Sequence, residues 1–542
     1  MSDSSKNGPP LVREVDVAVV GGGVAGAYAA WRLLNSPRLG EPLKVLASRQ
    51  RKLRVELFEY SDRIGGRLYS LQLPGVPSLP VELGGMRFLN SHTRVCSLVE
   101  RFKLGFRPLL VEDPHKLNLY YLRGQHCTAA DWQRPSFVPP YQLEPRERAR
   151  TPGELLIEVA LRFESEAENL RDVGFWNLLL RELSQEAYSL VREAGGYDTL
   201  VNNWSAAEAI PFLLADFPAD ARYMALNKGF QALPLTLASQ FETDGGVIRK
   251  NHRLHRIDWN EELQKLELLF DTTGGSGRLV VPQAPASRDA LLVRASHAIL
   301  AMPRRAIELL HPDSFLFQST DFQANLRSVL AQPAFKIFAA YRRPWWTKTR
   351  GITAGRSLTD LPIRQCYYWG TEEDCPGGTK GNKNSILMAS YSDGNSVEFW
   401  AGLARHPERY TPLPFACPPG VGITPFVENQ SASKRLVDEL QNQLRVLHGL
   451  NRVSPPKEGA QLLPPYATVY RDWTQEPFGG GWHFWKIGED SQAVMRFMRQ
   501  PYPGRPLYIC GEAWSRQQGW VEGALATADD VLENVLHLPP LT

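Results

Sequence analysis

The chain has 542 residues, of which 61 are Lys or Arg and 58 are Asp or Glu, so its formal net charge is only +3. Balanced charge argues against a dedicated nucleic-acid-binding protein, which concentrates basic residues to engage phosphates. Hydrophobic residues make up 43% of the chain and charged residues 22%, which excludes a disordered chain. At roughly 150 residues per domain, this length predicts three or four domains, or two large ones.

The six cysteines are scattered and form no CxxC pair. This spacing favours neither a zinc site nor a disulfide framework, so we expect no metal and a reducing compartment. The first ten residues are polar and show no secretory signal. An uncharged, predominantly apolar stretch between Asp16 and Arg32 has 15 residues, fewer than the roughly 20 that span a bilayer. We therefore expect a soluble cytoplasmic protein with no membrane or nucleic-acid partner.

The first informative segment is a glycine motif between a predicted strand and a predicted helix. Residues 15–20 (VDVAVV) are typical of a short buried strand, and GGGVAG follows at 21–26. An alanine-rich helix is predicted from about 27 to 34. A GxGxxG motif in this setting indicates a dinucleotide-binding turn.

Each residue of this motif has its own task in such a turn. Gly21 permits the tight turn, Gly23 lets a pyrophosphate approach the backbone, and Gly26 lets the helix pack closely on the strand. Val24 and Ala25 lie just before the predicted helix, whose N-terminus offers free N–H groups and partial positive charge to phosphates. A purely structural glycine-rich turn is the alternative.

A second predicted strand, residues 53–59 (LRVELFE), ends in an acid. Glu59 lies 33 residues after Gly26, whereas the usual interval is about 20. We interpret the excess as a surface insertion around residues 35–51. Glu59 would accept hydrogen bonds from ribose hydroxyls, and a solvated glutamate is the alternative. The GGR at 65–67 then offers a second approach for an anion, which a simple nicotinamide dehydrogenase does not need.

These motifs resemble those of the flavin-dependent amine oxidase family, whose members carry GxGxxG and then an acid followed by GGR. Three further blocks match in the family's order. VELGGMRF at 81–88 is similar to the segment under the flavin ring, and FKIF at 335–338 to the strand with a flavin-facing lysine. CGE at 510–512 with GWVEGA at 519–524 is similar to the C-terminal flavin block.

The resemblance implies an α/β fold with three parts. A discontinuous Rossmann-like FAD-binding domain would comprise residues 1–95, 225–305 and 470–542. A helical domain would comprise residues 100–225, and a mixed-sheet substrate-binding domain residues 306–470. The family also suggests a homodimer.

Periodicity adds several elements to this outline. Apolar residues recur at helical spacing between 155 and 214, and an amphipathic helix is predicted near 433–447. A helix is also predicted over 521–537, and Pro- and Gly-rich loops over 375–384 and 412–422.

The resemblance implies FAD as cofactor. The residues that would contact it are Gly21, Gly23, Val24, Ala25, Gly26, Glu59, Arg67, Gly84, Gly85, Met86, Arg87, the backbone of Leu254, Gly511, Glu512, Trp520, Val521 and Ala524. Some family members tether the flavin through a cysteine just before the first of two aromatic residues that enclose the substrate. Gly481 stands at that place here, so we expect FAD to be bound non-covalently.

The arginine of GGMR indicates the branch of the family. In L-amino-acid oxidases and their monooxygenase relatives this arginine holds the substrate carboxylate. Carried over, Arg87 would form a bidentate pair with the carboxylate, a geometry that a guanidinium provides and an ammonium cannot. A surface arginine, or one that binds FAD phosphate, is the alternative.

Tyr367 and Trp369 lie in the segment QCYYWG, which we interpret as a strand with both on one face and Tyr368 on the other. By the resemblance, Tyr367 would donate to the substrate carboxylate and Trp369 would line the pocket. A buried aromatic pair in the core of a sheet is the alternative.

Trp482 and Trp520 match the two aromatic residues that enclose the substrate's α-carbon, and Gly519 adjoins the second. Two facing indoles would exclude water and orient the amino group. Some L-amino-acid oxidases have a histidine near the substrate, but residues 151–220 contain none. We therefore assign no protein base.

Four residues of the predicted helical region are candidates for the side-chain pocket: Asp198, Trp204, Glu208 and Asp216. An inward acid would favour arginine or lysine as substrate, whereas Trp204 would favour larger neutral side chains. Each could equally be a helix-surface or core residue.

The predicted activity is that of an FAD-dependent L-amino-acid oxidase. Hydride transfer from the substrate to flavin N5 would give an imino acid that hydrolyses to a 2-oxo acid and ammonia. Lys336 would assist reoxidation by molecular oxygen to hydrogen peroxide, since a fixed positive charge stabilises developing negative charge. A salt-bridged strand lysine is the alternative for Lys336.

Three other functions remain open. An amino-acid 2-monooxygenase, which forms an amide, shares every motif named. A polyamine or monoamine oxidase is disfavoured by Arg87, since amines without a carboxylate do not require it. A non-catalytic FAD-binding scaffold is disfavoured by the aromatic pair and by the predicted carboxylate anchor.

Overall fold

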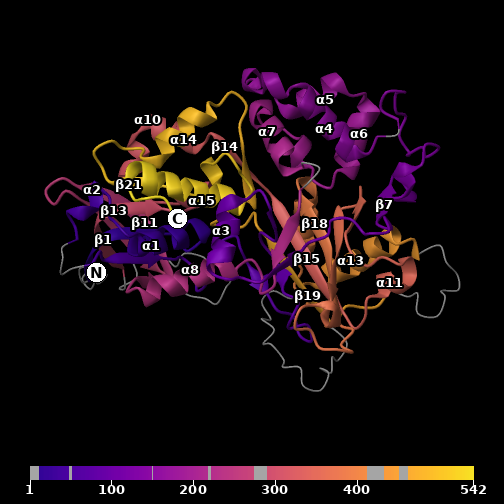
Figure 1. Cartoon of the computed structure of the whole chain (residues 1–542), viewed down its shortest axis with the longest axis horizontal. Coiled ribbons are helices and arrows are strands. Elements are labelled where there is room, and N and C mark those ends of the chain that lie inside the picture. The colour runs from indigo at the N-terminus through magenta and orange to yellow at the C-terminus, as the bar shows by residue number, and fades with distance from the viewer. Residues whose placement is uncertain are drawn as a thin grey trace, which may run out of the picture.

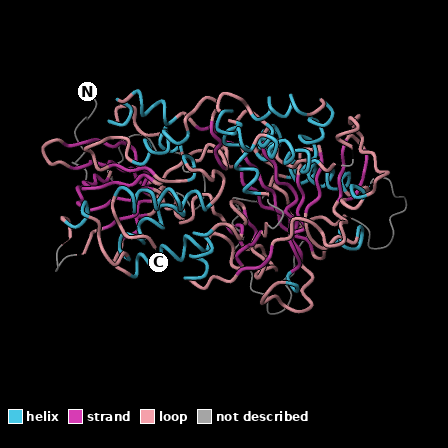
Figure 2. Tube along the Cα trace, turned by 45° about the horizontal axis from the view of Figure 1, so that its top comes forward, coloured by secondary structure: helices cyan, strands magenta, loops and turns pink. Residues whose placement is uncertain are grey.

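The computed structural model describes residues 11–47, 52–148, 150–217, 221–273, 290–411, 432–450 and 462–541. Two sheets dominate the described part of the chain, each with helices around it (Figure 2). In Figure 1 the sheet that contains the N-terminal strand lies at the left, and the second sheet lies at the lower right beneath a group of helices. The predicted loop at 412–422 lies outside the described residues.

The first sheet is a parallel core with an antiparallel extension. Its order is β10-β2-β1-β13-β12-β11, and β21 also pairs with β13. The bounds are β1 Leu11–Val20, β2 Val55–Phe58, β10 Val247–Arg249, β11 His252–Asn260, β12 Lys265–Thr272, β13 Leu291–Leu300 and β21 Leu507–Ile509. Strands β10, β2, β1, β13 and β21 pair in parallel, whereas β11, β12 and β13 pair antiparallel. Segments from both ends and the middle of the chain therefore form one sheet.

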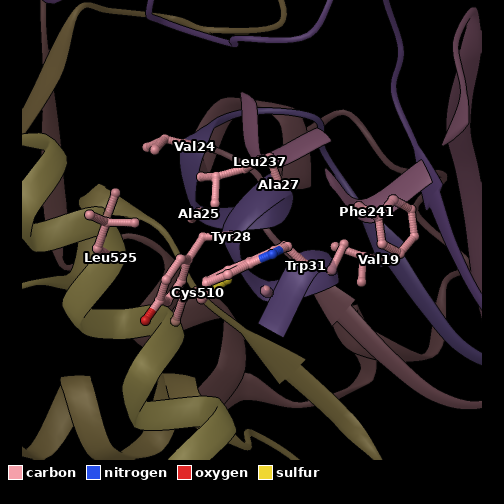
Figure 3. Close-up of a cluster of buried hydrophobic side chains, with 14 of the residues drawn as sticks. Val19, Val24, Ala25, Ala27, Tyr28, Trp31, Leu237, Phe241, Cys510 and Leu525 are labelled. Atoms are coloured by element: carbon pink, nitrogen blue, oxygen red, sulfur yellow. The ribbon is translucent and has the colours of Figure 1, made fainter. Parts of the chain in front are cut away.

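Apolar layers cover both faces of this sheet. Figure 3 shows one of them, where Ala27, Tyr28 and Trp31 of α1 pack among side chains from other helices and from β1. The helices of this layer are α1 Val24–Asn35, α3 Thr93–Arg101, α8 Ala232–Thr243 and α15 Val521–Asp529, which continues as a π-helix over Asp530–Val535. The elements of the opposite layer are the 3-10 turns Phe315–Gln318 and Glu512–Trp514, α10 Thr320–Leu326 and α14 Ser491–Arg499, and the short helix α9 Arg304–Glu308 contributes one side chain.

The predicted elements of this region are present with different bounds. Strand β1 begins at Leu11 and not at residue 15, and α1 begins at Val24, directly after Gly23, and not at 27. The proposed surface insertion at 35–51 is in part packed, because Leu43 of the short helix α2 (Glu41–Lys44) is fully buried. A Cβ on Gly40 would come within 1.8 Å of the Leu536 carbonyl oxygen, so this segment packs against the C-terminal helix.

The second sheet has the order β19-β15-β18-β17-β16-β7-β8. Its strands are β7 Leu119–Leu122, β8 Gln125–Thr128, β15 Ala334–Tyr341, β16 Arg356–Thr359, β17 Gln365–Thr371, β18 Ser385–Asp393 and β19 Ala467–Asp472. The helices α11 Trp345–Arg350, α12 Asn395–Ala404 and α13 Lys434–Leu447 pack on one face. The predicted amphipathic helix is thus confirmed as α13, whose first turn is capped by the Ser433 hydroxyl.

Two segments lie outside the domain to which we assigned them. The hairpin β7–β8, expected within the helical domain, extends the second sheet. Residues 315–326, expected within the substrate-binding domain, pack instead on the first sheet. The hairpin joins the second sheet through the pairing of β7 with β16, whereas residues 315–326 are placed by burial of their apolar side chains on the first sheet.

A group of helices lies above the second sheet in Figure 1. They are α4 Pro152–Arg162, α5 Phe175–Glu182, α6 Gln185–Ala194 and α7 Ala206–Asp216, with 3-10 turns at Asp131–Gln133, Glu164–Leu170 and Thr199–Val201. Helix α4 begins with a capping box, in which Thr151 and Glu154 satisfy each other's backbone N–H.

Short ladders connect these parts. They are β3 Ser70–Leu71 with β4 Val81–Glu82, β5 Phe88–Leu89 and β6 Phe106–Pro108 with β9 Tyr223–Leu226, and β14 Val329–Gln332 with β20 Trp482–Trp485. A further 3-10 turn covers Glu372–Asp374. Ladders β5–β9 and β14–β20 hold segments that line the cavity described next.

Candidate active site

A cavity of about 370 Å³ extends from the carboxyl end of β1 to the helical group. Every residue that we predicted to contact FAD lines this cavity, with the exception of Gly26. The strand ends, the GGR loop and the C-terminal block therefore converge on one space, as expected where parallel strands end.

The glycine motif forms an open cradle at one end of the cavity. A Cβ on Gly21, whose φ is +110°, would come within 2.4 Å of the Ala301 carbonyl oxygen. One on Gly26 would come within 1.9 Å of the Gly21 carbonyl oxygen, so Gly26 serves the packing of helix on strand. One on Gly23 would meet no atom closer than 3.9 Å, which leaves its backbone open to a phosphate. These features fit the pyrophosphate of FAD.

Glu59 lines the cavity and also holds the cradle together. One carboxylate oxygen accepts the N–H of Gly22 at 2.6 Å, and the other accepts the N–H of Ser61 at 2.9 Å. The carboxylate thus connects the end of β2 to the glycine turn, beside the space where a ribose would lie.

An ion pair between the part-buried Arg67 and the buried Glu512 connects the GGR loop to the C-terminal block. Arg67 lies 2.7 Å from Glu512, which also accepts from the ring of His483 at 2.9 Å. The N–H groups of His483 and Gly519 donate to the other Glu512 oxygen at 2.8 and 2.7 Å. Burial works to raise the pKa of Glu512, but Arg67 and His483 hold it well below its usual range.

Lys336 of β15 lines the cavity from the second sheet. Its Nζ donates to the carbonyl oxygens of Gly84 at 2.6 Å and Glu82 at 3.3 Å, and lies 4.5 Å from the centre of the Tyr391 ring. Burial lowers the pKa of Lys336 to about 7, and the like charge of Arg87 lowers it further, whereas Glu82 opposes the shift. The expected fixed positive charge is therefore one that titrates near neutral pH. Burial likewise raises the pKa of Glu82 to about 7.

Arg87 is buried at the wall of the cavity and has no carboxylate within ion-pair distance among the described residues. Its guanidinium carbon lies 4.3 Å from the centre of the Tyr223 ring and 5.9 Å from that of Trp520. It also donates to the Tyr367 hydroxyl at 3.4 Å. An unpaired buried guanidinium on a cavity wall is suited to bind an anion.

Tyr367 does not itself line the cavity; it lies behind Arg87. Its hydroxyl also accepts from Arg356 at 3.0 Å, across the β16–β17 ladder. The tyrosines that line the cavity near Arg87 are Tyr197 and Tyr391, which the sequence analysis missed. Tyr391 of β18 pairs directly with Lys336 of β15, whereas β17 lies one strand further away. Tyr391 could therefore have been found only from the order of these strands.

The predicted alternation of side chains along β17 is confirmed, but Trp369 does not line the cavity as predicted. Tyr368 packs on the helix-covered face, whereas Trp369 packs on the other face against Phe338, with ring centres 5.3 Å apart. The Trp369 indole N–H donates to the Pro80 carbonyl at 2.8 Å, so Trp369 belongs to the core under that loop and does not line the cavity.

Trp482 and Trp520 both line the cavity, as does Gly519. Gly519 has φ +79°, and a Cβ there would lie 3.7 Å from the Trp482 side chain, so the two aromatic segments adjoin. The Trp482 ring centre lies 6.4 Å from that of Tyr197. A Cβ on Gly481 would come within 2.7 Å of the Ala334 side chain, which leaves little room for a tethering cysteine.

Of the four side-chain pocket candidates, only Asp216 lines the cavity. Asp198 forms a 2.9 Å ion pair with Arg364, and Glu208 bonds to the Ser491 hydroxyl. Trp204 stacks on Phe484 with ring centres 3.9 Å apart and lies behind the wall. The described residues of the helical group and its connecting segments that line the cavity are Tyr197, Leu200, Phe212, Asp216 and Phe217.

The fold and this cavity define a flavoprotein of the dinucleotide-binding class. A family model described as flavin containing amine oxidoreductase matches residues 24–413 and 402–536, which is most of the chain. The chain belongs to this family, and its cofactor is FAD.

Individual relatives align with most of the chain at low sequence identity. Aplysianin-A of Aplysia kurodai is 26% identical over 565 residues, covering 96% of this chain and 90% of that protein. L-amino-acid oxidase of Notechis scutatus scutatus is 23% identical over 524 residues, covering 94% and 84%. A double mutant of putrescine oxidase has a similar structure, with a TM-score of 0.64 at 16% identity over 96% of this chain and 99% of that one. That likeness concerns the fold alone.

In the part of the chain that the structure describes, no helix is both long and apolar enough to cross a membrane.

Proposed function

We propose that this flavoprotein is an L-amino-acid oxidase, which converts L-amino acids to 2-oxo acids with release of ammonia and hydrogen peroxide. The observation that carries the proposal is Arg87, a buried guanidinium on the cavity wall without a carboxylate partner among the described residues. A buried charge without a partner is costly. A substrate carboxylate would neutralise it, whereas a simple amine would add a second positive charge.

Arg87 is held ready for this role before substrate arrives. The Tyr367 hydroxyl and the Tyr223 ring fix the guanidinium from two sides. A guanidinium that is already immobilised loses less conformational entropy on binding a carboxylate than a mobile side chain would. Tyr391 lines the cavity, whereas Tyr367 does not, so Tyr391 replaces Tyr367 as the candidate for a second carboxylate contact.

When bound, the flavin accepts the electron pair and hydrogen of the substrate Cα–H bond and passes the electrons to oxygen. The residues of this chain bind, orient and enclose the substrate. Trp482 and Trp520 line the space beside Arg87 and would exclude water from the α-carbon. Lys336, in its ammonium form, would stabilise negative charge that develops on reduced oxygen.

The side-chain end of the cavity favours large neutral substrates. Its wall on the side of the helical group includes Tyr197, Leu200, Phe212 and Phe217, and Asp216 is the one acid among the described lining residues of that group. Because Asp216 bonds to Trp520, whose ring centre lies 5.9 Å from the Arg87 guanidinium carbon, we assign this acid to the carboxylate end and not to the side-chain end. We therefore expect leucine, methionine or aromatic amino acids to be preferred over lysine and arginine.

Anaerobic titration with a panel of L-amino acids tests the proposal, because a substrate bleaches the flavin absorbance near 450 nm. Product analysis in air then separates the oxidase from an amide-forming monooxygenase: the oxidase yields one 2-oxo acid and one peroxide per oxygen consumed. An amide with carbon dioxide would overturn the oxidase reaction but retain the substrate class. A flavin that no L-amino acid bleaches would overturn the proposal.

A further inference from the structure

Amine oxidation requires the neutral amine, yet an amino acid reaches the cavity as an ammonium. A group on the cavity wall that can accept the extra proton would remove this barrier. Four carboxylates line the cavity: Glu59, Asp216, Glu476 and Glu512. Their hydrogen-bond and ion-pair partners differ, and these partners leave one of the four suited to accept a proton.

Three of these carboxylates are already engaged. Glu59 accepts backbone N–H groups in the glycine cradle. Glu512 is bound by Arg67 and His483, and Glu476 forms an ion pair with Arg305. A carboxylate held by cations or by several N–H groups is a poor proton acceptor, because these partners stabilise its charged form.

Asp216 is different. It is the last residue of α7, and the partner found for its carboxylate among the described residues is the neutral indole N–H of Trp520, at 2.7 Å. The carboxyl end of a helix carries partial negative charge, which disfavours an ionised carboxylate and so makes it more basic. Asp216 is nevertheless 7% exposed and lines the cavity, so a ligand there can reach it.

Asp216 and Arg87 both lie near the same indole, that of Trp520. The guanidinium carbon of Arg87 lies 5.9 Å from the Trp520 ring centre, and the Asp216 carboxylate lies at the Trp520 Nε1. An amino acid carries its carboxylate and its ammonium on one carbon. A guanidinium and a carboxylate that both adjoin Trp520 are suited to that pair of charges.

We propose that Asp216 is the group that takes the proton from the substrate ammonium. The inference rests on the proposed oxidation of amino acids. One N–H bond of the ammonium breaks, its electron pair stays on nitrogen as the lone pair, and an O–H bond forms on the Asp216 carboxylate. The neutral amine can then lose its Cα hydrogen as hydride. No histidine is required, which accounts for the lack of one in residues 151–220.

The surroundings of Asp216 suit a proton acceptor at neutral pH. Burial raises the pKa of Asp216 to about 7, and the Trp520 N–H and the charge of Arg87 oppose the shift. Among the described residues, two other titratable groups lie near it. The Tyr223 hydroxyl donates to the Asp216 backbone carbonyl at 2.9 Å, and His92 lies beyond Trp520, with ring centres 4.7 Å apart. Burial lowers the pKa of His92 to about 4, so His92 is neutral at pH 7 and does not compete for the charge.

The test compares Asp216→Asn with wild type and with Glu208→Gln. Asparagine keeps an oxygen that accepts from Trp520 but cannot take a proton. Glu208 lies on the same helix, bonds to Ser491 and does not line the cavity, so its variant is a matched control. The measured quantities are flavin content, affinity for a 2-hydroxy acid, which has no ammonium, and the limiting rate of anaerobic flavin reduction from pH 6 to 10.

Asp216→Asn is expected to keep its flavin and its affinity for the hydroxy acid. Its reduction rate should fall by about 100-fold or more at pH 7, the usual scale for a lost general base. The wild-type rate should rise with pH and level off above the Asp216 pKa, whereas the variant's rate should keep rising with the fraction of free amine. Glu208→Gln should match wild type throughout.

Three results would overturn the role of Asp216. They are a variant that is reduced as fast as wild type at pH 7, a variant slowed equally at every pH, and a wild-type profile without an inflection between pH 6 and 8. The third result concerns the wild-type protein alone, so it tests the proposal even if the variant fails to fold. If no L-amino acid reduced the wild-type flavin, the proposed function itself would fail, and this inference with it.

Discussion

Arg67 and Glu512 stand 445 residues apart in the chain and form a 2.7 Å ion pair at the wall of the cofactor cavity. Glu512 also binds His483 and the N–H of Gly519. One carboxylate thus connects the loop after β2, the strand with Trp482 and the turn before Trp520. This contact therefore helps to hold together the three segments that line the site.

Glu512→Gln should lower the free energy of unfolding by about 3 kcal/mol or more at pH 7, since removal of one partner leaves Arg67 without its buried counter-charge. Arg67 and His483 hold the pKa of Glu512 well below its usual range. Its contribution is therefore complete above the unfolded-state pKa, roughly 4.3, and declines as pH falls below it.

Thermal or urea unfolding at pH 7 and at pH 3 measures this effect. The difference between wild type and variant should shrink at the lower pH. Asp438→Asn is the control, because Asp438 pairs with Lys434 on the exposed face of α13 and its loss should cost under about 1 kcal/mol. Equal effects of the two substitutions would contradict a structural role for the Arg67–Glu512 pair.

Arg87→Ala should raise KM for amino acids at least about 10-fold, since one hydrogen bond to a charged group is worth roughly 1.5–3 kcal/mol. Bound FAD should be retained, which the flavin absorbance reports. Tyr367→Phe removes only the hydroxyl that holds Arg87 and should have a smaller effect in the same direction. Loss of flavin from Arg87→Ala would instead assign Arg87 to the cofactor.

Lys336→Met should slow reoxidation by oxygen more than reduction by substrate in stopped-flow absorbance. Burial lowers the pKa of Lys336 to about 7, so its ammonium form predominates below that pH and is lost above it. Wild-type reoxidation should therefore slow as pH rises through about 7, and the variant should show no such step. Equal slowing of the two half-reactions would exclude Lys336 from the oxygen reaction.

Denaturation in acid should release free yellow flavin into the supernatant. The position of the tethering cysteine is Gly481, where a Cβ would come within 2.7 Å of Ala334. Colour that stays with the precipitated polypeptide would refute non-covalent binding.

The cofactor end of the site could be predicted from sequence because its determinants are local. Gly21, Gly23 and Glu59 act through their own backbone turn or strand end, so short motifs specify them. Of the residues assigned there, only Gly26 lies off the cavity, where the packing of α1 requires it.

The substrate end depends on pairings between distant segments, which short motifs do not encode. Whether Tyr367 or Tyr391 faces the cavity depends on how β17 and β18 are ordered beside β15. Among the helical candidates, Asp216 lines the cavity because α7 ends there, whereas Trp204 packs behind it on Phe484. Periodicity predicted these helices but not which of their ends reaches the site.

The most direct test of the central claim is anaerobic flavin reduction of the wild-type protein by matched pairs that differ only in the carboxylate. L-phenylalanine with phenethylamine and L-leucine with isopentylamine are suitable pairs. Because Arg87 is proposed to bind the carboxylate, each amino acid should reduce the flavin at low concentration and its amine only at concentrations at least about 10-fold higher. Amines that reduce the flavin as readily as their amino acids would contradict the account.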